Sequence, residues 1–223
     1  MHNITIISSK HVELGKCNSL QLLEILNSIN PEVIFEELPK SYYDLYYGNN
    51  STKSTLETIA ITDFKKTKKI KQVLVDTTDF PFLEALKNNY SIVLDHCLNF
   101  RQKNGLPIKE AILTSNQLLH EQGFKYLNSN DAEIYQANIK TLISECLIQL
   151  NSRRYFETSK HWQSLTDFRE NHMIKSIYEF SEQNEYDEAV FTLGVAHRKS
   201  IKAKINDFQN KSDIKLHWNF YGD

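Results

Sequence analysis

Apolar residues in this chain gather in short runs near its two ends, and between these runs they recur every three or four positions. Short runs rich in Val, Ile and Phe with polar residues on either side are typical of buried strands, and the wider spacing is typical of helices. The runs predict strands at 4–7, 33–35, 73–76, 190–193 and 214–219. The wider spacing predicts helices at 19–29, 54–69, 81–88, 91–103, 108–121, 131–150, 155–182 and 198–210.

The order of these elements predicts the fold class. The first strand, the first helix and the second strand together take about 30 residues, which is the length of a unit with two parallel strands and a crossover helix. A long helical stretch then separates the third strand from the fourth. We therefore expect one α/β domain over residues 1–223, built on a small, mostly parallel sheet flanked by helices, with a helical insertion at 81–182.

Composition narrows the classes of protein to consider. Of the 223 residues, 40% are hydrophobic and 24% are charged, and the formal net charge of −2 gives no field that favours nucleic acid or an anionic membrane. The three cysteines have no C-x-x-C spacing, which favours a reducing compartment over a disulfide framework or a structural zinc site. No apolar run approaches the roughly 20 residues of a membrane span, and no signal peptide is recognisable. We expect a soluble, cytoplasmic protein without nucleic-acid or membrane partners.

Polar side chains stand at the predicted carboxyl ends of four strands. They are His11, Glu37, Asp76 and His197. The carboxyl ends of parallel strands meet at one rim of a sheet, so these side chains share a crevice if their strands are neighbours. Two imidazoles beside carboxylates can ligate a divalent metal ion or perform acid–base chemistry on a water molecule. The alternative is that each residue only caps a loop or a helix.

A second group of candidates lies on the long helix predicted at 155–182. Arg169 and Glu170 precede an apolar helical face that includes Met173. An arginine there can neutralise a substrate carboxylate, stabilise an oxyanion or orient a site glutamate through a bidentate contact. The alternative is a surface ion pair, which contributes little. The sequence contains no G-x-G-x-x-G, Walker, H-E-x-x-H or G-x-S-x-G motif, so nothing favours the common nucleotide-binding, zincin or serine-hydrolase classes.

Other conspicuous residues have simpler interpretations. The lysines at 65–71 are typical of a solvated helix end, where cations interact favourably with the helix dipole, although phosphate binding is an alternative. The tyrosines at 42–47 are interpreted as packing residues or pocket wall. Five histidines away from the strand ends are interpreted as structural: His96, His120, His161, His172 and His217.

The order of these motifs resembles that of the TraB/PrgY family, which includes the Tiki proteins, within a superfamily that also holds erythromycin esterases and ChaN proteins. The family has two Gly-x-x-His motifs, and Ser8-Ser9-Lys10-His11 and Gly194-Val195-Ala196-His197 occupy their places here. Between them, the family pattern is matched by Glu37-Leu38 after the second strand, Glu57 and Ala60 on a helix, Asp76 after the third strand, and Arg169-Glu170 with Met173. The chain departs from the family at Ser8, where the family has a glycine that lets the backbone approach a ligand closely.

The resemblance implies an α/β fold of the erythromycin esterase/ChaN type, with a cleft lined by the matching histidines, glutamates and arginine. Tiki-type members are regarded as metal-dependent proteases, and erythromycin esterases as hydrolases that use a histidine-activated water. Other members are regulators of peptide signals. The resemblance therefore indicates which residues form the site more closely than it indicates the substrate.

The resulting hypothesis is a hydrolase that attacks an ester or amide carbonyl of a small molecule or peptide. His11 and His197 would hold the water, directly or through a divalent metal ion (manganese, cobalt or zinc) bound by His11, Glu37 and His197. Glu37 would act as general base or ligand, Glu57 as a second acid or ligand, and Arg169 would stabilise the oxyanion. Two alternatives stay open: a non-catalytic binding or regulatory protein that uses the same cleft, and an effector such as a toxin or phage-defence component.

Overall fold

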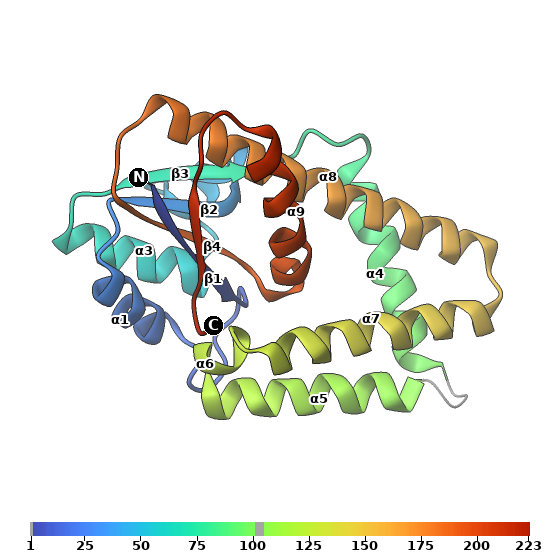
Figure 1. Ribbon diagram of the computed structural model, residues 1–223. Helices are drawn as coiled ribbons and strands as arrows, with labels where there is room; N and C mark the ends of the chain where they lie inside the picture. The colour runs from blue at the N-terminus through green and yellow to red at the C-terminus, as the bar shows by residue number, and fades with distance from the viewer. Residues whose placement is uncertain (1, 101–104) are drawn as a thin grey trace.

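A five-stranded parallel sheet forms the centre of the computed structural model, which describes residues 2–100 and 105–223 (Figure 1). The strands are β1 (Asn3–Ser9), β2 (Val33–Pro39), β3 (Lys71–Asp76), β4 (Glu188–Gly194) and β5 (His217–Phe220). They lie in the order β3-β2-β4-β1-β5, and every neighbouring pair is parallel. The predicted α/β class with a small parallel sheet is confirmed.

The two strands that lead into the histidine motifs are neighbours, although they come from opposite ends of the chain. β1 pairs with β4 over its whole length, and the register places Ser8 opposite Leu193 and Ser9 opposite Gly194. Because the two strands run in the same direction, the residues that follow them leave the sheet at the same rim. Ser8 itself lies within β1, so a serine there requires no left-handed backbone.

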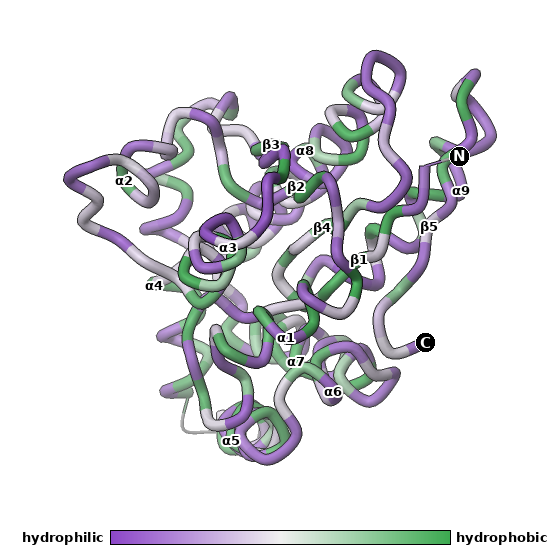
Figure 2. The backbone as a smooth tube through the Cα atoms, turned by 90° about the vertical axis from the view of Figure 1, so that its left-hand side faces the viewer, coloured by the Kyte–Doolittle hydropathy of each residue, from purple (hydrophilic) through white to green (hydrophobic). Residues whose placement is uncertain are grey.

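Helices cover both faces of the sheet, because successive side chains of a strand point to opposite sides. In β2, Ile34 belongs to the same buried cluster as residues of α1 (Ser19–Ile29) and α3 (Leu56–Thr67). Its neighbour Phe35 belongs to the opposite cluster, with residues of α8 (Arg153–Gln183) and α9 (Arg198–Lys211). Figure 2 shows β2, β4 and β1 between α3 on one side and α9 on the other.

The chain between β3 and β4 forms an arm of helices that reaches beyond the sheet (Figure 1). The arm contains α4 (Leu83–Asn99), α5 (Gly105–Gln122), α6 (Phe124–Leu127), α7 (Asn130–Leu150) and the first part of α8. The later part of α8 returns to the sheet, where Met173 and Ile177 are buried in its core. The arm has a small apolar cluster of its own, made by Val93, Cys97, Ile108, Cys146 and Leu147.

The helix boundaries differ from the predicted ones for local reasons. A single α4 replaces the two helices predicted at 81–88 and 91–103, because nothing at Asn89 or Tyr90 breaks a helix; residues 101–103 of that prediction lie outside the described residues. Pro81 lies in a turn before α4 and does not begin it. α1 begins at Ser19 as predicted, and the side chain of the preceding Asn18 caps its first turn by accepting a hydrogen bond from the backbone N–H of Gln21.

Short elements surround the rim at which the strands end. η1 (Lys40–Tyr42) and α2 (Tyr43–Tyr47) follow β2, and η2 (Val195–His197) joins β4 to α9. The pairing of β2 with β3 shifts register between Glu36 and Pro39, which is a bulge at the end of β2. Bulges of this kind re-aim side chains at the ends of strands.

Within the two described ranges, no helix combines the length and the apolar character that crossing a bilayer requires.

Candidate functional site

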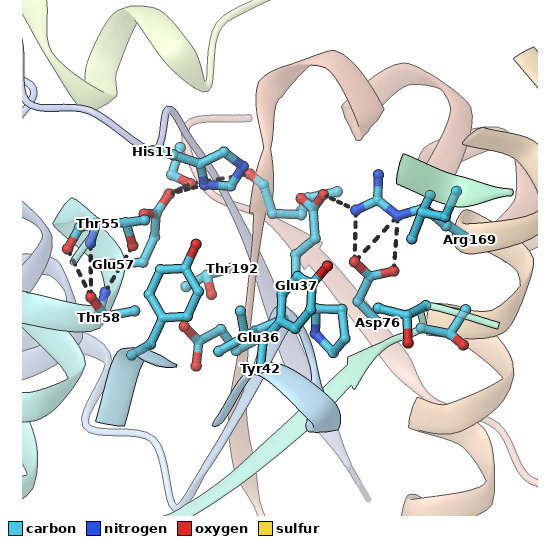
Figure 3. A pocket seen from close by; sticks show the side chains of 18 of the residues that line it. His11, Glu36, Glu37, Tyr42, Thr55, Glu57, Thr58, Asp76, Arg169 and Thr192 are labelled. Atoms are coloured by element: carbon cyan, nitrogen blue, oxygen red, sulfur yellow. Dashed lines mark hydrogen bonds and ion pairs between the residues drawn. The ribbon is translucent and has the colours of Figure 1, made fainter. Parts of the chain in front are cut away.

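A cavity of about 350 Å³ lies at the rim where β1, β2, β3 and β4 end, and its size suits a small ligand. The strands supply its floor, while α3 and α8 supply charged side chains from opposite sides (Figure 3). Five candidates from the sequence line this cavity: His11, Glu37, Glu57, Asp76 and Arg169.

His11 is held by a buried carboxylate behind it. Its Nδ1 lies 3.2 Å from Glu57 Oε1, and Ser9 Oγ donates a hydrogen bond to the same oxygen. The side chain of His11 is 56% exposed and that of Glu57 only 5% exposed, so the ring meets solvent while its partner does not. The hydrogen bond to Glu57 raises the pKa of His11 to about 9. Because Nδ1 faces Glu57, Nε2 is the ring nitrogen left for a ligand.

Glu37 is the carboxylate on which the other groups converge. The backbone N–H of Gly194 donates to Oε2 over 2.6 Å, Arg169 Nη2 donates to Oε1 over 2.9 Å, and His197 Nε2 lies 3.3 Å from Oε1. Burial alone would raise the pKa of Glu37, but the charge and hydrogen bond of His197, together with Arg169, hold it well below its usual range. Glu37 is therefore an anion with both oxygens already occupied.

Gly194 marks the point at which the two histidines meet. A Cβ atom at this position would lie 3.8 Å from His11 Nε2 and 3.8 Å from His197 Cδ2, and 3.5 Å from Glu37 Oε2. The structure thus brings both imidazoles beside one carboxylate at the carboxyl ends of β1 and β4.

Arg169 forms ion pairs with two carboxylates, those of Asp76 and Glu37. Its Nε lies 3.0 Å from Asp76 Oδ1 and its Nη2 lies 2.7 Å from Asp76 Oδ2, in addition to the bond with Glu37. The arginine side chain is 18% exposed and that of Asp76 is 3% exposed, so this pair is largely buried. Among the described residues nothing accepts a hydrogen bond from Nη1, which Figure 3 shows pointing away from both carboxylates.

His197 lies on the far side of Glu37 and lines a second cavity, of about 480 Å³, which it shares with Arg169. Its Nδ1 is 2.7 Å from Glu170 Oε1, and Glu170 also accepts bonds from Ser200 Oγ at 2.5 Å and Lys204 Nζ at 3.0 Å. Burial would lower the pKa of His197, but the charges of Glu37 and Glu170 and their hydrogen bonds raise it to about 9. His197 is thus a buried imidazolium at neutral pH.

Two of the three predicted metal ligands, Glu37 and His197, contact each other, and the third, His11, contacts Glu57. Both ring nitrogens of His197 face carboxylates, and a guanidinium lies on Glu37. In the part of the chain that the structure describes, no three His, Cys, Asp or Glu side chains are grouped so that they could hold a metal ion. Because these contacts do not fit a bound ion, the chemistry proposed for this site uses the side chains alone, and the predicted manganese, cobalt or zinc stays a prediction.

Glu36 is a site residue that the sequence did not single out. It is 4% exposed and lines the first cavity, and its carboxylate accepts hydrogen bonds from Tyr47 Oη at 2.9 Å and Gln72 Nε2 at 2.7 Å. Burial raises the pKa of Glu36 to about 7. The signal in the sequence was its place beside Glu37 at the end of β2, where the register with β3 shifts and both residues line the cavity.

The lysines, tyrosines and histidines that the sequence did not place in the site are either away from the first cavity or part of its wall. Lys65 Nζ donates to Gln72 and Lys66 Nζ to Asp63, so these two lysines bond to protein groups at the surface. Tyr42 and Tyr46 line the first cavity. The five histidines interpreted as structural do not line either cavity.

Compared with known proteins, the chain matches no family model, no curated protein and no solved structure. The resemblance to TraB/PrgY proteins therefore stays a prediction based on the order of the motifs.

Proposed function

We propose that this protein is a hydrolase of ester or amide bonds in a small molecule or peptide, with its active site in the 350 Å³ cavity. One observation carries the proposal: His11, Glu57, Glu37 and Arg169 come from four separate segments of the chain and meet around this cavity in charge-assisted contacts. Polar groups fixed in this way, beside a solvent-accessible opening, suit acid–base chemistry on a bound carbonyl group.

His11 is the residue that activates the water in this proposal. Glu57 holds Nδ1–H, so the neutral ring presents a lone pair on Nε2 to the cavity. As the water oxygen bonds to the carbonyl carbon, one water proton passes to His11 Nε2 and the carbonyl π electrons move to the oxygen. When the tetrahedral intermediate collapses, the bond to the leaving group breaks and His11 returns the proton to that group.

Arg169 supports the negative charge that develops on the carbonyl oxygen. Its Nε and Nη2 are fixed by Asp76 and Glu37, and its free Nη1 can donate to an oxyanion without reorganising. Glu37 acts by positioning, because its oxygens already accept bonds from Gly194 and Arg169 and face His197. Because these contacts occupy both oxygens of Glu37, we assign the general-base role to His11 and not to Glu37.

The test compares wild-type protein with His11→Ala, Arg169→Gln and Glu24→Gln on a panel of p-nitrophenyl esters and p-nitroanilides. Glu24 is an exposed glutamate on α1, so Glu24→Gln is the matched control. We expect unchanged turnover in the control and a loss of about 10²–10³-fold on removing the oxyanion donor. Full activity of His11→Ala on every substrate that the wild type hydrolyses would show that the assignment is wrong.

Elemental analysis of the same preparations tests the metal separately. Stoichiometric manganese, cobalt or zinc that is lost in His11→Ala would favour a metal-dependent hydrolase. A protein that turns over no substrate but retains a small molecule through purification would favour the binding or regulatory alternative.

A further inference from the structure

Glu36 is the one carboxylate on the wall of the first cavity that has no cation beside it among the described residues. Glu37 and Asp76 share Arg169, and Glu57 faces His11. No lysine, arginine or histidine nitrogen of the described chain lies within 4.0 Å of the Glu36 carboxylate. A buried carboxylate without a counter-ion is costly, so this position favours a ligand that brings a positive charge.

The neutral groups around Glu36 hold it in place without neutralising it. Tyr47 Oη is 2.9 Å from both carboxylate oxygens, and Gln72 Nε2 is 2.7 Å from Oε2. Lys65 Nζ donates over 2.8 Å to the Gln72 carbonyl oxygen, which leaves the amide N–H groups of Gln72 to face Glu36. The nearest lysine therefore reaches Glu36 only through Gln72.

A second carboxylate on the same side of the cavity also lacks a partner. Glu57 is 4% exposed, its Oε1 contacts Ser9 and His11, and its Oε2 has no hydrogen-bond partner in the described residues. Figure 3 shows Glu36 and Glu57 on the side of the cavity opposite Asp76 and Arg169. A buried carboxylate oxygen without a donor is an unmade hydrogen bond that a ligand's N–H group can supply.

Two tyrosines, Tyr42 and Tyr46, also line the cavity, and aromatic rings attract cations. Lys87 Nζ already lies over the Tyr42 ring, 5.8 Å from its centroid, so Tyr46 is the ring left for an ammonium group of a ligand. An ammonium carries three donors, which matches two carboxylates and leaves one hydrogen for the carbonyl side of the ligand or for water. Arg169, across the cavity, offers the opposite charge to a carbonyl or carboxylate oxygen.

We propose that the Glu36 and Glu57 side of the cavity binds a protonated amine of the substrate, so that the protein hydrolyses esters or amides that carry an amino group near the scissile carbonyl. This inference rests on the hydrolase function proposed above and names its substrate class. Glu36 is the specificity residue, because Glu57 also orients His11.

The test uses two p-nitroanilides that differ only in the group of interest. Alanine p-nitroanilide carries the amine, and isobutyryl p-nitroanilide has a methyl group in its place. We expect the wild type to prefer the alanine compound by about tenfold or more in kcat/KM, which is the scale of one charge-assisted hydrogen bond. In Glu36→Gln we expect kcat/KM to fall for the alanine compound and to stay unchanged for the isobutyryl compound, so that the preference is lost. Glu24→Gln should keep the preference. A preference that survives Glu36→Gln, or a wild type that favours the isobutyryl compound, would overturn the inference.

Calorimetry with alaninamide and isobutyramide gives a readout that needs neither turnover nor a stable variant. Tighter binding of alaninamide by wild-type protein supports the amine site, and equal binding of the two amides overturns it. If the wild type binds alaninamide preferentially but hydrolyses nothing, the hydrolase proposal fails while the amine site stands. If both anilides are hydrolysed equally by wild type and Glu36→Gln, the amine site fails while the hydrolase proposal stands.

Discussion

Arg169 and Asp76 form a bidentate ion pair across the rim of the sheet, with Arg169 Nε 3.0 Å from Asp76 Oδ1 and Nη2 2.7 Å from Oδ2. The pair joins α8, at the end of the helical arm, to the last residue of β3. Glu37 accepts from the same guanidinium, which links the pair to the end of β2. The position of α8 over the sheet and the geometry of the cavity therefore depend on the same contact.

Removing one partner of this pair is expected to cost stability. Asp76→Ala leaves a mostly buried guanidinium with only Glu37 beside it, and breaking a buried pair typically costs about 3 kcal/mol or more in the free energy of unfolding. Asp63→Ala is the matched control, because Asp63 pairs with Lys66 at the surface and should change stability by only about 0.5 kcal/mol or less. Urea denaturation checks both values, and equal small effects would show that the buried pair contributes little.

The pH dependence of activity should report on His11. The base form is the neutral ring, and the pKa of His11 is raised to about 9, so kcat/KM should increase with pH by about tenfold per unit between roughly 6 and 8. Glu57→Gln removes the group that raises this pKa, so the profile of that variant should shift to lower pH as its activity falls. A profile for the wild-type protein that is flat or decreasing between pH 6 and 8 would contradict the role of His11 as base.

The stability of Glu36→Gln should differ from that of wild type in a pH-dependent way. Burial raises the pKa of Glu36 from 4.5 to about 7, so the proton that the folded state holds contributes stability below pH 4.5, and this contribution is lost as the pH rises through about 7. The variant has no such loss. Relative to wild type, we expect the free energy of unfolding of Glu36→Gln to increase by up to about 3 kcal/mol between pH 4.5 and pH 8. Denaturation at both pH values checks this, with Glu24→Gln as control; a constant difference would refute the shift.

We expect Gly194→Ala to leave stability nearly unchanged but to reduce activity. Its φ of −62° suits any residue, and a Cβ would make ordinary contacts of 3.5 to 3.8 Å, so the stability of Gly194→Ala should stay within about 1 kcal/mol. The added methyl group lies between Glu37 and His11, so hydrolysis should fall by about tenfold or more. Gly123 has a φ of 60°, which side chains rarely adopt, and a Cβ there would lie 2.8 Å from the carbonyl oxygen of Lys16. Thermal denaturation should therefore show clear destabilisation of Gly123→Ala but not of Gly194→Ala.

The cysteines should resist thiol reagents while the protein is folded. Cys17, Cys97 and Cys146 are free and buried, and burial raises the pKa of Cys17 and of Cys97 to about 12. The thiolate that reacts is thus scarce as well as inaccessible. Labelling with a chromogenic disulfide should be slow in buffer and complete in denaturant, and fast labelling of native protein would contradict this burial.

Sequence pattern alone determined which segments are strands and helices, and that polar side chains follow four of the strands. Apolar runs and three-to-four spacing are local properties, so β1, β2, β3 and β4 and most helices could be predicted. The element order also indicated parallel pairing, because a strand, a helix and a strand in succession leave little alternative.

Only the tertiary structure decided which strands are neighbours and where each polar group faces. The pairing of β1 with β4 joins residues from the two ends of the chain, and no local pattern encodes such a pairing. Glu36 and Glu37, which are neighbours in β2, both line one cavity, whereas His197 lines another although it contacts Glu37. Burial and charge at each position then depend on groups distant in sequence, which is why the pairing of Arg169 with Asp76 and the lone carboxylate of Glu36 could be seen only in the folded chain.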